Sequence, residues 1–193
     1  MPVSKKQLIL DTGKKLFMER GIAATSMEQI AEAAPVSKMT IYNYFNSKEG
    51  LVEQIVEQWM NERYDVYRRI MEEAKDPLDA LQQFYTRAGL ESKDLSVAFV
   101  TDLTEMFPQL TDRMLALGKQ QILPGFEEMI FRGQQMGQIR KDISPHVLMM
   151  FLTFMKQFSL NSGALEGMSD LNTVTEQLTT ILYHGIIHPD YKK

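Results

Sequence analysis

The chain has 193 residues, of which 44% are hydrophobic and 24% are charged, and these proportions are typical of a globular protein. They exclude a disordered, collagen-like or disulfide-rich chain, and the absence of cysteine excludes thiolate metal sites and a cysteine nucleophile. The net charge of -4 is uneven: residues 1–50 carry seven Lys or Arg against five Asp or Glu, and residues 51–193 carry fourteen against twenty. A mildly basic head on an acidic body is typical of a DNA-reading domain joined to another domain.

The first two predicted helices lie in the basic head. Apolar spacing predicts a helix over residues 5–20, with Gly21 as its C-cap. We expect Thr25 to open a second helix, because Glu28 follows three residues later as in a capping box.

A third, very short helix is predicted from Ser37 to a point near Phe45, after a break at Pro35. A fourth helix is predicted over residues 47–73, with apolar residues along one side. The third and fourth helices therefore follow one another with almost no loop between them.

The rest of the chain also has helical spacing, so the predicted fold is all-α, with about nine helices. A strand over residues 95–101 is the alternative there, but no nearby segment could pair with it, and a helix is favoured. The last helix is predicted over residues 170–187. Helices between these segments should begin or break at four prolines, Pro77, Pro108, Pro124 and Pro145.

The segment 25–48 places two short helices on either side of a tight connection, which is the arrangement of a helix-turn-helix. At about 100° per residue, Ile41 and Phe45 face inwards and the opposite face of the second helix is left for DNA. Backbone N–H groups near Ser37 can receive a phosphate. The expected DNA contacts are Thr25, Ser37, Lys38, Met39, Thr40, Tyr42, Asn43, Tyr44 and Lys48.

These side chains suit two different tasks. Asn43 and Thr40 can hydrogen-bond to base edges, and Met39 can touch a thymine methyl. The hydroxyls of Tyr42 and Tyr44, together with the two lysines, can hold the phosphate walls of the groove. The alternative is that Tyr42 and Tyr44 are ordinary half-buried aromatic residues and that Asn43 is a surface residue with no role in binding DNA.

Residues 21–51 resemble the DNA-binding region of the TetR family of bacterial transcriptional regulators. Residues 16–21 are similar to the family's first helix, and residues 137–145 to the segment before its penultimate helix. The matching residues of the central motif are Thr25, Ile30, Ala31, Ala33, Val36, Ser37, Thr40, Ile41, Tyr42, Tyr44, Phe45, Ser47, Lys48 and Leu51.

The resemblance implies a helix-turn-helix domain over residues 1–50, linked through the helix 47–73 to a ligand-binding and dimerisation domain over residues 51–193. It implies a homodimer that binds a near-palindromic operator in double-stranded DNA, most often as a repressor, and leaves it when a small-molecule effector binds. The family usually has glycine where this chain has Pro35, and proline fixes φ near about -65°. We therefore expect a locally different turn.

Two C-terminal helices are expected to form the dimer interface. The segment 147–155 is apolar nearly all round, so one side should meet its own domain and the other a partner subunit. The last helix has a regular apolar stripe suited to a helix bundle. A single large core in a monomer is the alternative. The expected interface residues are Val147, Met150, Phe151, Phe158, Leu171, Val174, Leu178, Ile181 and Leu182.

An effector pocket is expected in the same domain. The chain has 14 methionines, whose flexible side chains adapt to varied ligands. A place in the ordinary core is the alternative for every candidate. The candidate lining residues are Phe84, Tyr85, Phe99, Met106, Met129, Phe154 and Met155.

No catalytic residue, metal site or cofactor is expected, because the sequence has no GxGxxG, GxxxxGK[ST], GxSxG or HExxH pattern. His184 and His188 are four residues apart but have no evident third ligand. The segment 147–155 is about half as long as a bilayer span, and no signal-peptide core occurs at the N-terminus. We expect a cytoplasmic protein without a membrane partner. The alternative function is a helical ligand-binding or interaction protein that binds no operator.

Overall fold

The computed structural model describes residues 4–91, 95–159 and 171–187. Its regular elements there are all helices, and the only bridge between extended residues in these ranges joins Ile139 to Ile187. The all-α prediction is confirmed. The helices α7 (Pro108–Leu117) and α8 (Leu123–Gln135) are continuous through a π-helical turn. If they are counted as one, the described residues form nine separate helices.

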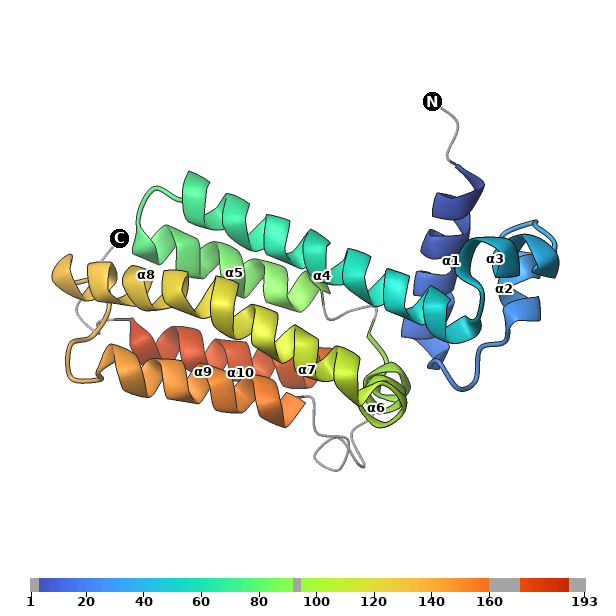
Figure 1. Ribbon diagram of the computed structural model, residues 1–193. Coiled ribbons are helices and arrows are strands. Elements are labelled where there is room, and N and C mark those ends of the chain that lie inside the picture. The colour runs from blue at the N-terminus through green and yellow to red at the C-terminus, as the bar shows by residue number, and fades with distance from the viewer. Residues whose placement is uncertain (1–3, 92–94, 160–170, 188–193) are drawn as a thin grey trace.

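The first three helices and the beginning of the fourth form one end of the molecule, and the long fourth helix continues from there into the body (Figure 1). A serine caps the N-terminus of each of them and accepts a hydrogen bond from the backbone N–H three residues on. These local signals explain why the predicted boundaries are close to the observed ones. The helices are α1 (Lys5–Arg20), α2 (Met27–Ala33), α3 (Lys38–Phe45) and α4 (Lys48–Glu73).

The predicted start of α2 was wrong by one residue. Ser26 is the N-cap, and its capping-box partner is Gln29 rather than Glu28. Thr25 is 1% exposed and its hydroxyl donates to the carbonyl of Gly21 at 2.8 Å. Its side chain therefore closes the loop after α1 and cannot cap α2 at the same time.

The body contains α5 (Pro77–Glu91), α6 (Val97–Met106), α7 (Pro108–Leu117), the π-helical turn η1 (Gly118–Ile122), α8 (Leu123–Gln135), α9 (Pro145–Ser159) and α10 (Leu171–Ile186). The helical interpretation of the segment 95–106 is confirmed, and three of the four prolines begin a helix. Pro124 instead follows the π-helical turn as the second residue of α8.

The hydrophobic core has two parts. One is formed by α1–α4 together with α6 and the start of α7, and it includes Phe17, Ile41, Phe45 and Phe99. The other lies among α4, α5, α8, α9 and α10. Because α6 is packed into the first part, the helix-turn-helix end shares its core with the body.

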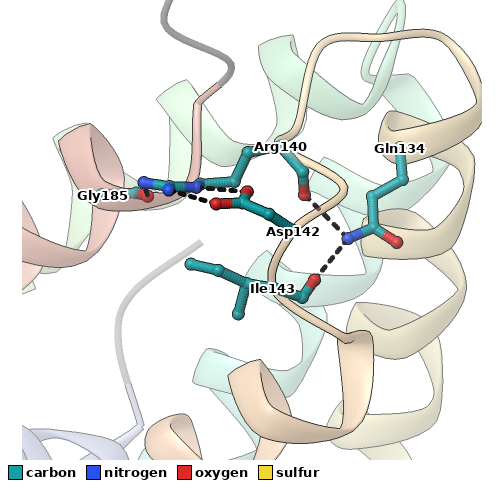
Figure 2. Close-up of polar contacts among 5 residues, drawn as sticks. All are labelled: Gln134, Arg140, Asp142, Ile143 and Gly185. Carbon is teal, nitrogen blue, oxygen red and sulfur yellow. Dashed lines mark hydrogen bonds and ion pairs between the residues drawn. The ribbon is translucent and has the colours of Figure 1, made fainter.

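A loop after α8 holds the C-terminal end of α10 (Figure 2). The guanidinium of Arg140 donates to the carbonyl of Gly185 at 3.2 Å, and its backbone N–H donates to the carbonyl of Ile186 at 3.0 Å. Asp142 pairs with the same guanidinium and raises its pKa, while the Gln134 amide fixes the loop by donating to the carbonyls of Arg140 and Ile143 at 2.9 and 2.7 Å. The two bonds from Arg140 satisfy the carbonyls of Gly185 and Ile186, which the last turn of α10 leaves without partners in the helix.

Candidate nucleic-acid interface

The third helix is anchored by its inward face. Ile41 and Phe45 are buried in the first part of the core. The ammonium of Lys6, an exposed residue, lies 5.8 Å from the centre of the Phe45 ring. Ser37 caps the helix and accepts a hydrogen bond from the N–H of Thr40. The side chains on the other face are thereby directed away from the core.

The turn before α3 needs no glycine. Ala34 is the C-cap of α2 and has φ of -93° and ψ of 15°, and the N–H of Val36 donates to the carbonyl of Ala31 at 3.0 Å. Within the described ranges, positive φ values occur only at Gly21, Asn46 and Gly137. Pro35 therefore fits a turn with negative φ throughout, as its ring requires.

The outward face of α3 exposes most of the side chains predicted to contact DNA. Met39 is 68% exposed, Tyr42 37% and Tyr44 43%. Asn43 is also exposed, whereas Thr40 is half-buried with its hydroxyl 2.8 Å from that of Ser37. The structure thus brings these residues together on one accessible surface, which we call the α3 face.

Lys38 has partners that the sequence did not indicate. Its ammonium forms an ion pair with Glu28 of α2 and lies 5.7 Å from the centre of the Tyr42 ring. The hydrogen bond between them lowers the pKa of Glu28 and raises the pKa of Lys38. Both side chains are exposed, so a phosphate can compete with Glu28 for the lysine.

Two further predicted DNA contacts have different surroundings. The hydroxyl of Thr25 is buried in its bond to Gly21, so the prediction of a side-chain contact with DNA at Thr25 was wrong. Lys48 is half-buried in the first turn of α4. Its ammonium extends from a helix that starts directly after α3.

The body contains an apolar cavity of about 270 Å³ whose lining comes from α4, α5, α8, α10 and the last residue of η1. Three aromatic rings, those of Tyr67, Phe84 and Phe126, form a cluster with centroids 4.6–5.7 Å apart. Of the side chains predicted to line an effector pocket, Phe84 lines this cavity.

Four of the other predicted lining residues do not line this cavity, because their side chains face elsewhere. Phe99 and Met129 are buried in the two parts of the core, and Met106 and Phe154 are exposed. Leu182, predicted for the dimer interface, lines the cavity instead. The side chains of Tyr85 and Met155 lie outside the described residues.

Sequence reasoning missed the polar and aromatic lining on α4. Arg63, Tyr67 and Ile70 stand at positions i, i+4 and i+7, so they share one face of that helix and all line the cavity. The spacing of these three residues is visible in the sequence and indicates a shared helix face. In the prediction from sequence this helix serves only as a link between domains, so its part in the cavity is not predicted.

Exposed apolar side chains gather on α9, with one on α10. On α9 they are Val147, Met150, Phe151 and Phe154, and on α10 Ile181 is exposed. Val174 and Leu178 are half-buried, and the side chains of Phe158 and Leu171 lie outside the described residues. Scattered apolar residues need no explanation, but a contiguous apolar patch of this kind is typical of an interaction surface.

Within the described residues, no helix has the length and apolar character that crossing a bilayer needs. The same part of the chain contains no group of three His, Cys, Asp or Glu side chains placed to hold a metal, and His188 lies outside it.

Two short helices, α2 and α3, are joined by a tight turn, and the second presents an exposed polar and aromatic face, which is the arrangement of helix-turn-helix DNA-binding proteins. Residues 9–55 match the family described as "Bacterial regulatory proteins, tetR family". This segment, which runs from α1 into α4, carries the DNA-binding region of that family. The protein is a DNA-binding transcriptional regulator and not an enzyme.

The relatives are similar over most of their length. The HTH-type transcriptional repressor DhaR of Mycobacterium sp. (strain GP1) is 29% identical over 151 residues, which are 76% of each chain. The HTH-type transcriptional repressor KstR2 of Rhodococcus jostii (strain RHA1) is 25% identical over 185 residues, covering 94% of this chain and 90% of its own.

Solved structures show the same fold at lower identity. The ketosteroid transcriptional regulator KstR2 of Mycobacterium tuberculosis has a TM-score of 0.63 at 22% identity, with 97% of both chains covered. Reduced NemR of E. coli has a TM-score of 0.71 at 15% identity, covering 97% of this chain and 99% of the other.

Proposed function

We propose that this protein is a cytoplasmic, homodimeric repressor that leaves a near-palindromic operator when a small-molecule effector enters the cavity. Its relatives DhaR and KstR2 are named as repressors, which supports this direction of control. The residues proposed to meet DNA are those of the α3 face together with Lys38 and Lys48. Tyr42, Tyr44 and the two lysines would contact phosphates, and Asn43 would contact base edges.

The observation that carries the proposal is the course of α4. One unbroken helix starts with Lys48 beside α3 and continues to Arg63, Tyr67 and Ile70 in the cavity wall. At about 1.5 Å per residue, the helix joins two sites roughly 30 Å apart. A ligand that displaces the cavity end of α4 would therefore change the position of α3.

A second connection supports the same coupling. The carboxylate of Asp102 on α6 accepts a hydrogen bond from the N–H of Ala23 at 2.7 Å, and the N–H of Ser96 donates to the carbonyl of Met18 at 2.9 Å. Both bonds fix the start of the helix-turn-helix end to the body. A movement of α6 is thus transmitted to α1.

The test of operator binding is retardation of the DNA upstream of the protein's own gene, repeated over a range of salt concentrations. We expect a discrete complex whose affinity falls steeply with salt, because phosphate contacts release counterions. Replacing Tyr42 and Lys48 with alanine should weaken it, whereas Lys119→Ala, an exposed lysine of the body, should not. Unchanged binding by the Tyr42 and Lys48 variants would refute the α3 face as the DNA surface.

A further inference from the structure

The cavity in the body is graded from a buried apolar floor to a charged mouth. Tyr67, Ile70, Leu81 and Ile186 line it and are buried, so they form the floor. Arg63 and Arg87 also line it but have exposed side chains, which places them at the mouth. A molecule that fills such a cavity has an apolar part inside and a polar part outside.

The floor is suited to a flat ring. The rings of Tyr67 and Phe84 lie 5.7 Å apart at an angle of 26°, and those of Tyr67 and Phe126 lie 5.7 Å apart at 23°. Offset aromatic arrangements of this kind accept further rings at similar spacing. The volume of about 270 Å³ lies at the small end of ligand pockets, which limits the occupant to one or two rings.

The charge at the mouth has one sign. The described lining residues include two arginines and neither aspartate nor glutamate. The guanidinium of Arg63 also lies 5.3 Å from the Trp59 ring, a contact that leaves its positive charge in place. A planar guanidinium matches a carboxylate in a two-point hydrogen bond.

Tyr67 adds no opposing charge. Its hydroxyl donates to the carbonyl of Ile122 at 2.9 Å, and burial raises its pKa to about 12. The close approach depends on Gly125, where a Cβ atom would lie 2.0 Å from that hydroxyl oxygen. The phenol thus stays neutral and held in place, and its ring remains part of the floor.

We propose that the cavity takes a small aromatic carboxylate, with its ring against the Tyr67–Phe84–Phe126 cluster and its carboxylate between Arg63 and Arg87. This inference rests on the proposed function in one respect, since it takes the cavity to be the effector site. The two arginines determine the charge of the ligand, and the ring cluster determines its shape.

The test compares two probes of equal shape, naphthoate and its uncharged amide, by titration calorimetry on the full chain. We expect naphthoate to bind about tenfold more tightly than naphthamide. The double variant Arg63→Gln with Arg87→Gln should lose this preference. The double variant Arg69→Gln with Arg132→Gln should keep it, because it removes the same charge from α4 and α8 at residues that do not line the cavity.

Three results would overturn the proposal: equal affinity for both probes, no binding of naphthoate at about 1 mM, or a preference that survives loss of Arg63 and Arg87. DNA retardation on the same preparation separates this outcome from failure of the proposed function. Naphthoate that binds with the expected preference without releasing DNA supports the ligand class and refutes only the effector role.

Discussion

At the start of α3, the ammonium of Lys38 is held by Glu28 of the neighbouring helix as well as by the ring of Tyr42. A lysine that already has an acidic partner gives less to DNA than a lysine free in solvent, because the phosphate must replace that partner. Exposed ion pairs contribute little to folding stability. The pair therefore affects binding to DNA more than it affects the fold.

The variant Glu28→Gln should bind DNA a few times more tightly, on operator and non-operator sequences alike, because it releases Lys38 for phosphates. The gain should shrink as salt is added. Fluorescence anisotropy on both kinds of DNA measures it. Glu32→Gln is the control, since Glu32 is also exposed on α2 and its loss changes the net charge equally. Equal gains from the two variants would mean that overall charge, and not Lys38, is responsible.

Asn43 and Tyr42 should differ in what their loss does. Asn43→Ala should reduce discrimination between operator and unrelated DNA by roughly 1–3 kcal/mol, because an amide can pair with a base edge. Tyr42→Phe keeps the ring beside Lys38 and removes only the hydroxyl, so it should weaken binding to all sequences by a similar factor. Competition assays with both DNAs measure the ratio. A wild-type ratio in the Asn43 variant would exclude it as a base-reading residue.

On the scale of single elements, the junction of α1 with α6 depends on a backbone that only glycine adopts easily. Gly21 has φ of 91° and ψ of 160°, and a Cβ atom there would lie 2.7 Å from Oδ2 of Asp102. That same carboxylate oxygen accepts the hydrogen bond from Ala23. A side chain at residue 21 would therefore strain the backbone and disturb the contact between the two ends of the molecule.

Gly21→Ala should lower the free energy of unfolding by about 1–3 kcal/mol, as measured by denaturant unfolding. Gly185→Ala is the matched control, because Gly185 lies in the last turn of α10 and no atom from another part of the structure lies within 4 Å of a Cβ atom there. Alanine is preferred over glycine in helical backbone, so this control should lose no stability. A loss of stability in both variants would show that position 21 is not special.

For the molecule as a whole, the proposed function places one α3 face and one cavity in each subunit, but the proposed operator has two halves. Two recognition helices about 34 Å apart meet successive turns of one groove. The proposed dimer would place them through the apolar face of α9 and α10. Four exposed apolar residues of α9 and Ile181 of α10 support this surface.

Met150→Glu should convert the dimer to a monomer, because it puts an unpaired charge into an apolar interface. Sedimentation should then give the mass of one chain, and affinity for the full operator should fall with it. Met106→Glu is the control, since Met106 is similarly exposed but lies on α6. A Met150 variant that still sediments as a dimer would move the interface elsewhere.

The order of the helices and most of their ends could be predicted from the sequence. Serine caps, Gly21 and the helix-starting prolines act within three or four residues, so their effect can be seen in the chain itself. The one-residue error at Thr25 arose because two neighbouring hydroxyls, those of Thr25 and Ser26, could each cap α2. The Thr25 hydroxyl instead donates to the carbonyl of Gly21, and Ser26 is the N-cap.

The amino-acid sequence alone determined the all-α class, the helix-turn-helix and which side chains of α3 face outwards, because these follow from local hydrogen bonds and from the spacing of apolar residues. The tertiary structure decided which apolar side chains line the cavity, which stay exposed on α9, and that Lys38 pairs with Glu28. Leu182 and Ile181 are neighbours of the same apolar type, yet one lines the cavity and the other is exposed. They differ because α5, which is distant in the chain, packs against the cavity side of α10 and leaves Ile181 exposed on another side.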